Sequence, residues 1–235
     1  MTRVAVLMAG ENIHGRLLIE KLMKRNLEPE IVINETNTER SKRLRAFLKN
    51  DIYCPPELHD FNLNVQHVNR FDSQDTVDIL RKLNPSYIIN GGCGIFRQNL
   101  LNITTILNVH PGLLPNFRGL DPVLWSLYYR QPIGATVHKI SAGIDEGPIY
   151  IVKEIPWTYA RSLIELRIQC ISWGADLLCD FLEDPKNYPE KVQKPNSGEY
   201  FSNFPKENIG LVEENLKFYV EYKGGNAFSC VERER

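Results

Sequence analysis

Short apolar runs alternate with segments of helical spacing along the first half of this chain. Residues 4–8, 30–34, 64–68, 87–90 and 103–109 are runs of the buried-strand type. Between them, apolar residues recur at helical spacing over 13–25, over 38–49 and from Ser73 onward. Strands that alternate with helices are typical of a parallel sheet covered by helices. The sequence therefore predicts an α/β fold with a mostly parallel central sheet flanked by helices.

The pattern changes after residue 110. Residues 122–129 predict a helix with Pro122 in its first turn, where proline is tolerated. Residues 134–140 and 149–155 alternate like a hairpin or a mixed edge, and 160–182 predicts the longest helix.

A chain of 235 residues accommodates one large α/β domain plus an appendage. We expect a domain over 1–182 and a short C-terminal extension over 183–235, which closes the active site or mediates a dimer. Core signal is sparse in the extension: 216–222 is expected to be an isolated strand or part of an interface, and 224–235 to be frayed.

Charge and composition restrict the class of partner. The net charge is −1 and no block of basic residues occurs, so no nucleic-acid partner is expected. No apolar run is long enough to span a membrane, and the first strand is too short an apolar stretch for a signal peptide. The five cysteines form no C-x-x-C pair, which argues against a zinc knuckle or a redox dithiol. Cys170 and Cys179 are predicted core residues, and the protein is expected to be cytoplasmic and reduced.

Polar side chains gather where the fifth predicted strand ends. Side chains two apart on a strand point to the same face, so Asn108 and His110 are expected to project together. Pro111 cannot donate to a sheet ladder and should end the strand there. Open α/β sheets place their ligands at this carboxyl end. Asp145, in a glycine-flanked loop, supplies a carboxylate, and the three groups together are suited to acyl or formyl transfer.

Several motifs resemble those of the folate-dependent formyltransferases. Residues 108–115 read Asn-Val-His-Pro-Gly-Leu-Leu-Pro, Arg118-Gly119 follow, residues 134–138 read Gly-Ala-Thr-Val-His, and an aspartate stands at 145. The family includes glycinamide ribonucleotide transformylase, methionyl-tRNA formyltransferase and the sugar N-formyltransferases. The resemblance implies a Rossmann-like formyltransferase fold, 10-formyl-tetrahydrofolate as cosubstrate and no metal. It also implies that Asn108, His110 and Asp145 are the catalytic residues.

Formyl transfer to an amine passes through a tetrahedral adduct, and each catalytic group meets one of its needs. The Asn108 amide can donate to the developing oxyanion. His110 accepts the amine proton when neutral or stabilises the oxyanion when protonated, and the sequence leaves both roles open. Asp145 holds the imidazole or an ordered water and assists proton delivery to the departing folate nitrogen. For His138, the sequence supports two roles about equally. One is a catalytic role, and the other is that of a structural histidine near the site whose hydrogen bonds are made within the protein.

The resemblance also predicts a folate pocket built from two segments. Residues 91–96 match the segment that lies against the pterin in the family, and residues 140–145 form the other wall. The predicted cofactor-binding residues are Cys93, Gly94, Ile95, Phe96, Ile140, Gly143 and Ile144.

Three features of the sequence restrict which amine is expected to accept the formyl group. Glu11 lies in the turn where purine transformylases bind a phosphate, and it would repel one. Residues 183–235 are too few for the barrel of a tRNA formyltransferase, and the net charge does not favour tRNA. We therefore expect a nucleotide-linked amino sugar as substrate and a homodimer as the assembly. The predicted substrate-binding residues are Gly10, Asn12, His14, Arg118 and Trp125.

Three alternatives to the sugar interpretation stay open. One is an amino acid or the amine of a peptide-synthetase substrate as acceptor, because residues 119–125 resemble formylation domains of those enzymes. The other two are hydrolysis of the formylated folate and folate binding without turnover.

Overall fold

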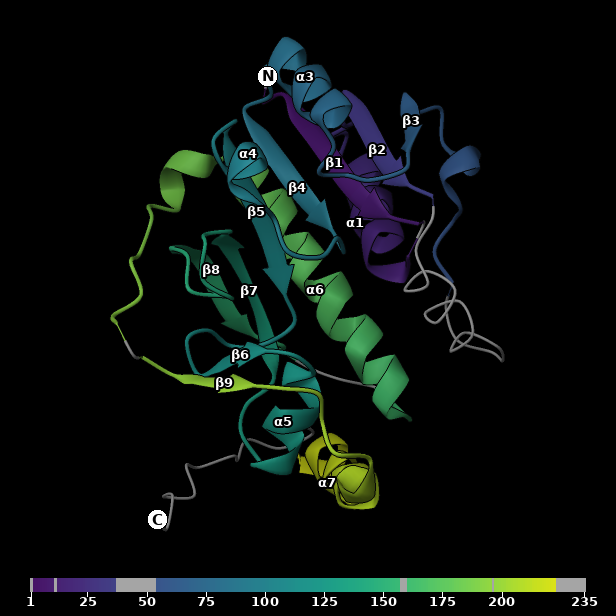
Figure 1. Ribbon diagram of the computed structural model, residues 1–235. Helices are drawn as coiled ribbons and strands as arrows, with labels where there is room; N and C mark the ends of the chain where they lie inside the picture. Colours follow the sequence, from purple (N-terminus) through teal and green to yellow (C-terminus); the bar gives the residue numbers. More distant parts are fainter. Residues whose placement is uncertain (1, 11, 37–53, 157–159, 196, 223–235) are drawn as a thin grey trace.

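The computed structural model describes residues 2–10, 12–36, 54–156, 160–195 and 197–222 (Figure 1). Its strands are β1 (Val4–Ala9), β2 (Ile31–Glu35), β3 (Val65–Val68), β4 (Tyr87–Gly91), β5 (Thr105–His110), β6 (Phe117–Gly119), β7 (Gly134–Lys139), β8 (Ile149–Glu154) and β9 (Glu199–Phe201). Its α-helices are α1 (Ile13–Lys24), α3 (Gln74–Leu83), α4 (Gln98–Leu101), α5 (Pro122–Tyr128), α6 (Leu163–Glu183) and α7 (Ile209–Tyr222). Short 3₁₀ turns lie at Leu58–Asp60, Pro185–Asn187 and Lys206–Asn208. The predicted helix over 38–49, the turn residue Glu11 and the C-terminal stretch over 224–235 lie outside the described residues.

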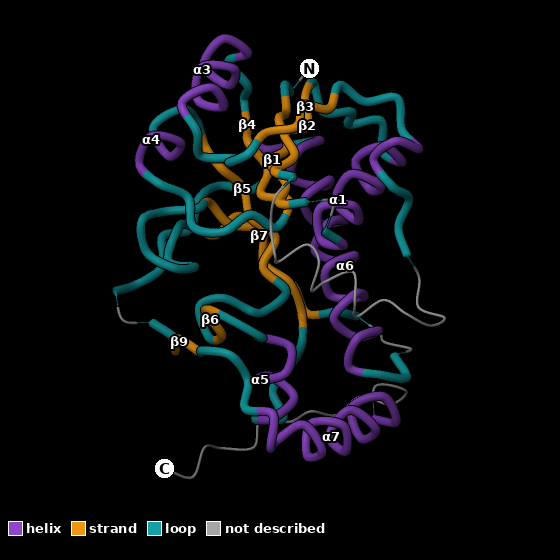
Figure 2. The backbone as a smooth tube through the Cα atoms, turned by 45° about the vertical axis from the view of Figure 1, so that its right-hand side comes forward, coloured by secondary structure: helices purple, strands orange, loops and turns teal. Residues whose placement is uncertain are grey.

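The central sheet has seven strands in the order β3-β2-β1-β4-β5-β7-β8. The first five of these run parallel, whereas β7 pairs antiparallel with both β5 and β8. Helices α1 and α6 cover one face, and α3 and α4 lie on the other (Figures 1 and 2). The predicted α/β fold with a mostly parallel sheet flanked by helices is confirmed.

Strand β1 shows why this sheet needs cover on both faces. All six of its residues are buried. Val4, Val6 and Met8 pack with α1 and α6, whereas Ala5 and Leu7 belong to the core on the side of α3. An uninterrupted apolar run is what a central parallel strand requires, because both of its faces lie in a core.

Side-chain caps start helices α1, α3 and α6. The Asn12 side chain accepts from the Gly15 N–H at the start of α1, and Ser73 accepts from the Thr76 N–H at the start of α3. Ser162 caps α6 in the same way, so this helix begins three residues later than the predicted 160. Such caps satisfy N–H groups that have no partner inside the helix.

The segment after α6 helps to form a third hydrophobic core together with α5 and α6. The expectation that this segment contributes few core residues was therefore wrong. Strand β9 pairs parallel with β6 in a separate two-stranded sheet, and α7 packs on α5. Residues 216–222 are part of helix α7, so their prediction as an isolated strand was wrong. Val212 and Leu216 of α7 are buried in this core. The apolar run from Phe218 to Val220 looked like a strand, but the spacing of four from Val212 to Leu216 is that of one helix face.

None of the helices within the described ranges is long and apolar enough to cross a membrane.

The predicted core cysteines Cys170 and Cys179 are fully buried, and burial raises the pKa of the Cys179 thiol to about 12.

Candidate active site

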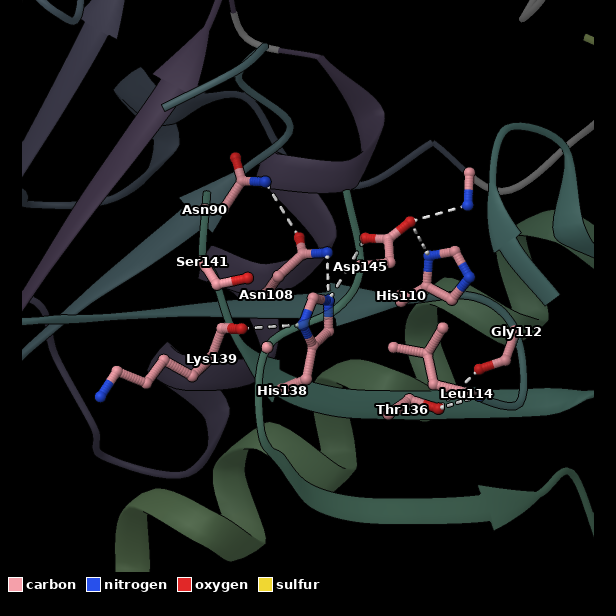
Figure 3. Close-up of polar contacts among 12 residues, drawn as sticks. Asn90, Asn108, His110, Gly112, Leu114, Thr136, His138, Lys139, Ser141 and Asp145 are labelled. Atoms are coloured by element: carbon pink, nitrogen blue, oxygen red, sulfur yellow. Dashed lines mark hydrogen bonds and ion pairs between the residues drawn. The ribbon is translucent and has the colours of Figure 1, made fainter. Parts of the chain in front are cut away.

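Three polar side chains form a row across adjacent strands at the carboxyl end of β5. Ile89 of β4 is level with Leu107 of β5, so the next residues, Asn90 and Asn108, lie side by side. Asn108 is in turn the partner of His138 on β7. Asn90 Nδ2 donates to Asn108 Oδ1 over 2.9 Å, and Asn108 Nδ2 lies 2.9 Å from His138 Nε2 (Figure 3). The row fixes the position of the amide that the sequence predicts to be an oxyanion donor.

The hydrogen bonds of His138 define its protonation state. Its Nδ1 lies 3.0 Å from the carbonyl of Lys139, which can only accept, so Nδ1 carries the proton. Nε2 is then the acceptor for the Asn108 amide. Burial lowers the pKa of His138 to about 4; the nearby Asp145 opposes this shift and His110 adds to it. His138 is therefore neutral at physiological pH.

His110 is buried and held by one short hydrogen bond. Its Nε2 lies 2.7 Å from the carbonyl of Phe117, and its Nδ1 lies 3.6 Å from Asp145 Oδ2. Gly112 is needed beside the ring, because a Cβ atom there would lie 2.8 Å from His110 Nε2. With Nε2 protonated, the basic nitrogen of the neutral ring is Nδ1, on the side of Asp145.

Asp145 joins the two histidines. Its Oδ2 accepts from the backbone N–H of Gly119 at 2.9 Å, and its Oδ1 lies 3.5 Å from His138 Nε2. The residue has a φ of 54°, a left-handed conformation that aspartate tolerates better than most residues. The structure thus brings Asn108, His110 and Asp145 together.

A glutamine of the C-terminal extension holds the Asp145 loop from outside. Gln193 Nε2 donates to the carbonyls of Asp145 at 2.8 Å and of Gly147 at 2.7 Å. Sequence reasoning missed Gln193 and the Gly119 amide, because both reach the site through pairing with a distant segment. It also missed Asn90, although a polar residue that ends a buried strand before Gly91-Gly92 is a usable signal.

The predicted folate segments present both buried and exposed residues. Cys93 and Phe96 point into the core, where Phe96 packs on Phe71 with ring centroids 5.3 Å apart. Gly94 is exposed, and Ile95 and Ile144 are 78% and 48% exposed. In the second segment, Ile140 packs at the edge of the core and Gly143 is partly buried. The exposed isoleucines are the apolar surfaces that remain for a flat ring.

A hollow of about 660 Å³ lies beside this region, at the carboxyl ends of β2 and β3. It is lined by Glu35, Asn69, Arg70, Phe71, Asp72, Ile95 and Arg97. Only Ile95 among these is a predicted folate residue.

The predicted substrate residues fall into two groups. Gly10 and Asn12 lie in the turn between β1 and α1, and His14 lies in the first turn of α1. Gly10 N–H donates to Asn34, and the buried Asn12 donates to the carbonyl of Gly91 at 2.7 Å. The Asn12 amide thus fixes the turn against the end of β4, and His14 is partly buried.

The second group lies near residues 198–204 of the extension. Arg118 forms an ion pair of 2.7 Å with Glu146, and Trp125 Nε1 donates to the carbonyl of Ser202 at 3.0 Å. Tyr200 is level with Arg118 across the β6–β9 pair and is 52% exposed.

Within the described residues, no group of three or more His, Cys, Asp or Glu side chains has the arrangement of a metal site. The arrangement instead combines an oriented amide donor, a basic imidazole nitrogen and a carboxylate beside it. These are groups that can stabilise an oxyanion and move a proton.

Comparison with known proteins agrees with the motifs. The sequence profile of the family described as "Formyl transferase" matches residues 2–170. The chain is 26% identical over 187 residues to methionyl-tRNA formyltransferase of Finegoldia magna, covering 74% of this chain and 56% of that protein. It is 25% identical over 226 residues to the Thermotoga maritima methionyl-tRNA formyltransferase, covering 90% of this chain and 71% of that one. The chain thus spans little more than half the length of the first of these relatives.

Solved structures share the fold at low identity. A sugar N-formyltransferase from Shewanella superposes with a TM-score of 0.61 at 20% identity, covering 90% of this chain and 87% of that chain. Glycinamide ribonucleotide transformylase 1 from Symbiobacterium toebii gives a TM-score of 0.58 at 21% identity, covering 83% and 95%.

Proposed function

The chain belongs to the formyl transferase family, and on that premise we propose that it transfers a formyl group from 10-formyl-tetrahydrofolate to a nucleotide-linked amino sugar. The observation that carries the proposal is the convergence of Asn108, His110 and Asp145 at the carboxyl end of β5.

Asn108 and His110 act on the two charges that develop during transfer. As the amine nitrogen bonds to the formyl carbon, the carbonyl oxygen becomes an oxyanion. The Asn108 Nδ2–H that is not used by His138 donates to this oxyanion. His110 Nδ1 accepts the proton that the amine loses. Collapse of the adduct breaks the bond to the folate N10 atom, which takes up a proton.

Asp145 and His138 support these steps in different ways. The Asp145 carboxylate faces His110 Nδ1 and stabilises the imidazolium that forms. The imidazolium of His110 then gives this proton to the leaving folate nitrogen, directly or through a water held by Asp145. His138 is neutral and accepts from Asn108, so it positions the donor.

For the folate, the fit rests on the exposed isoleucines. Ile95 and Ile144 come from the two predicted walls and offer apolar side chains to a flat ring. Backbone groups of residues 91–96 and 140–145 supply the polar partners.

For the acceptor, the surface around Arg118 favours a nucleotide. The exposed Tyr200 ring lies over Gly119, since a Cβ atom on that glycine would be 2.8 Å from Tyr200 Cε2. The backbone N–H of Gly119 donates a hydrogen bond to Asp145, so only Gly119 separates the Tyr200 ring from the catalytic carboxylate. An aromatic ring next to a guanidinium suits a nucleobase joined to a diphosphate. The Shewanella neighbour, whose title names a sugar N-formyltransferase, is in keeping with this acceptor.

Methionyl-tRNA is the second candidate acceptor, because the two curated relatives described above are methionyl-tRNA formyltransferases. The net charge of −1 does not favour binding to an RNA backbone.

The test is release of tetrahydrofolate, followed by absorbance, against a panel of nucleotide-linked amino sugars and methionyl-tRNA. Asn108→Ala and His110→Ala serve as controls. We expect turnover with an amino sugar that both substitutions abolish. Turnover without any acceptor would identify a hydrolase, and turnover with methionyl-tRNA alone would overturn the sugar proposal.

A further inference from the structure

Asn90 lies one strand away from the predicted oxyanion donor and is 9% exposed. Its side chain has two kinds of partner. Asn90 Oδ1 accepts the backbone N–H groups of Gly92 at 3.1 Å and Cys93 at 2.8 Å. Asn90 Nδ2 donates to Asn108 Oδ1 at 2.9 Å. One amide therefore bridges the predicted folate segment and strand β5. Figure 3 shows its contact with Asn108.

These partners allow only one orientation of the Asn90 amide. Two N–H donors require an acceptor, so the oxygen of Asn90 must face Gly92 and Cys93. Its NH2 group must then face β5. A side-chain amide carries a donor group at one end and an acceptor group at the other. The orientation of the Asn90 amide therefore determines which group of the next residue in the row can face it.

The orientation of Asn108 follows from that of Asn90. Asn108 must turn its oxygen toward the NH2 of Asn90, which sends its own NH2 toward His138 and the reaction site. His138 accepts one of these two hydrogens, and the second is left for the substrate. A reversed Asn108 would present an oxygen to the developing oxyanion and would repel it.

We propose that Asn90 is a positioning residue that sets which end of the Asn108 amide faces the formyl oxygen, and that it does so from the backbone of the folate segment. The inference rests on the proposed formyl transfer. It adds that residues 91–93 take part in orienting the oxyanion donor as well as in lining the pocket.

The substitution Asn90→Asp separates positioning from a structural role. The new carboxylate has nearly the same shape and still accepts from Gly92 and Cys93, so the turn is kept. It has no NH2 for Asn108 and offers a second acceptor in its place. If Asn90 only holds the turn, this variant should behave as wild type. Asn84→Asp is the matched control, since it adds the same charge at an exposed position at the end of α3.

The readout is the ratio of dissociation constants for 5,8-dideazafolate and its 10-formyl derivative, measured by calorimetry without any acceptor. Both ligands are compared on the same sample, so an unfolded fraction cancels. We expect wild type and Asn84→Asp to prefer the formylated ligand. We expect Asn90→Asp to lose about tenfold of that preference, the size of one hydrogen bond, and about 10²-fold in kcat.

Two results would overturn the inference, and they differ. An unchanged preference in Asn90→Asp would reject the positioning role alone. A wild-type protein that binds neither ligand would reject the proposed function and the inference with it.

Discussion

His110 donates its Nε2–H to the carbonyl of Phe117 over 2.7 Å, and this bond decides which nitrogen of the ring is basic. A carbonyl can only accept, so the lone pair of the neutral ring lies on Nδ1, 3.6 Å from Asp145 Oδ2. Of the two roles that the sequence leaves open for His110, this geometry favours the base.

We therefore predict that His110→Gln lowers kcat by about 10²- to 10⁴-fold, the range for a general acid or base. The glutamine amide can still donate to Phe117 but cannot take up a proton. Steady-state kinetics of formyl transfer, with wild type and variant compared at the same pH, check this. A variant within threefold of wild type would contradict the role of base.

Removing the amide of Asn108 should affect the reaction more than substrate binding. We predict that Asn108→Ala lowers kcat by about 10²- to 10³-fold, the loss typical of one oxyanion donor. The KM for the folate should change far less. Steady-state kinetics check this, and an effect on KM alone would assign Asn108 to binding.

The buried neutral His138 should make the protein sensitive to acid. Its pKa is about 4 in the folded state and near 6.5 when exposed, so between these values the unfolded chain binds more protons. The stability present above pH 6.5 is thus lost as the pH falls toward 4, by up to about 3 kcal/mol for this group. Urea unfolding of wild type and His138→Gln across this range tests the claim. The two should differ in slope, and parallel curves would contradict it.

Gln193 links the extension to the loop that carries Asp145, through two backbone carbonyls. We predict that Gln193→Leu destabilises the protein by about 1–3 kcal/mol, as expected for two lost hydrogen bonds. It should also lower kcat, because Asp145 is less well held. Gln98→Leu is the control, since the exposed Gln98 side chain donates to the side chain of the exposed Asn102. Equal kcat in the two variants would show that the link does not reach the chemistry.

Helix α7 offers a test of its packing on α5. Leu216 is 4% exposed, whereas Leu211 on the same helix is 43% exposed. We predict that Leu216→Ala costs about 2–5 kcal/mol and Leu211→Ala less than about 0.5 kcal/mol. Equal losses, measured by urea unfolding, would argue against the helix as placed.

The parts of the fold that sequence predicts best are those with one dominant period. Strand β1 has six apolar residues in a row, and helix α3 has a serine cap and apolar residues at helical spacing, so both were located to within a residue or two. The sequence favours a strand over part of helix α7, because the β-formers Phe218, Tyr219 and Val220 follow one another along the chain. Packing against α5 decides the outcome there, and a local pattern does not contain it.

The candidate site also has features that the sequence predicts and features that it does not. Asn108 and His110 share a strand, so their common direction follows from the period of two. The row that joins Asn108 to Asn90 and His138 depends on the register of three strands, which no local pattern encodes. Gln193 lies 48 residues from Asp145 in the chain and reaches it only after the extension folds back.

The central claim is transfer of a formyl group to a nucleotide-linked amino sugar, and a competition experiment tests it most directly. The protein is incubated with folate that carries an isotopically labelled formyl group, together with a nucleotide-linked amino sugar and methionyl-tRNA. Mass spectrometry then follows the label. The account predicts label on the sugar amine, absent in Asn108→Ala. Label on methionyl-tRNA only, or released only as formate, would contradict it.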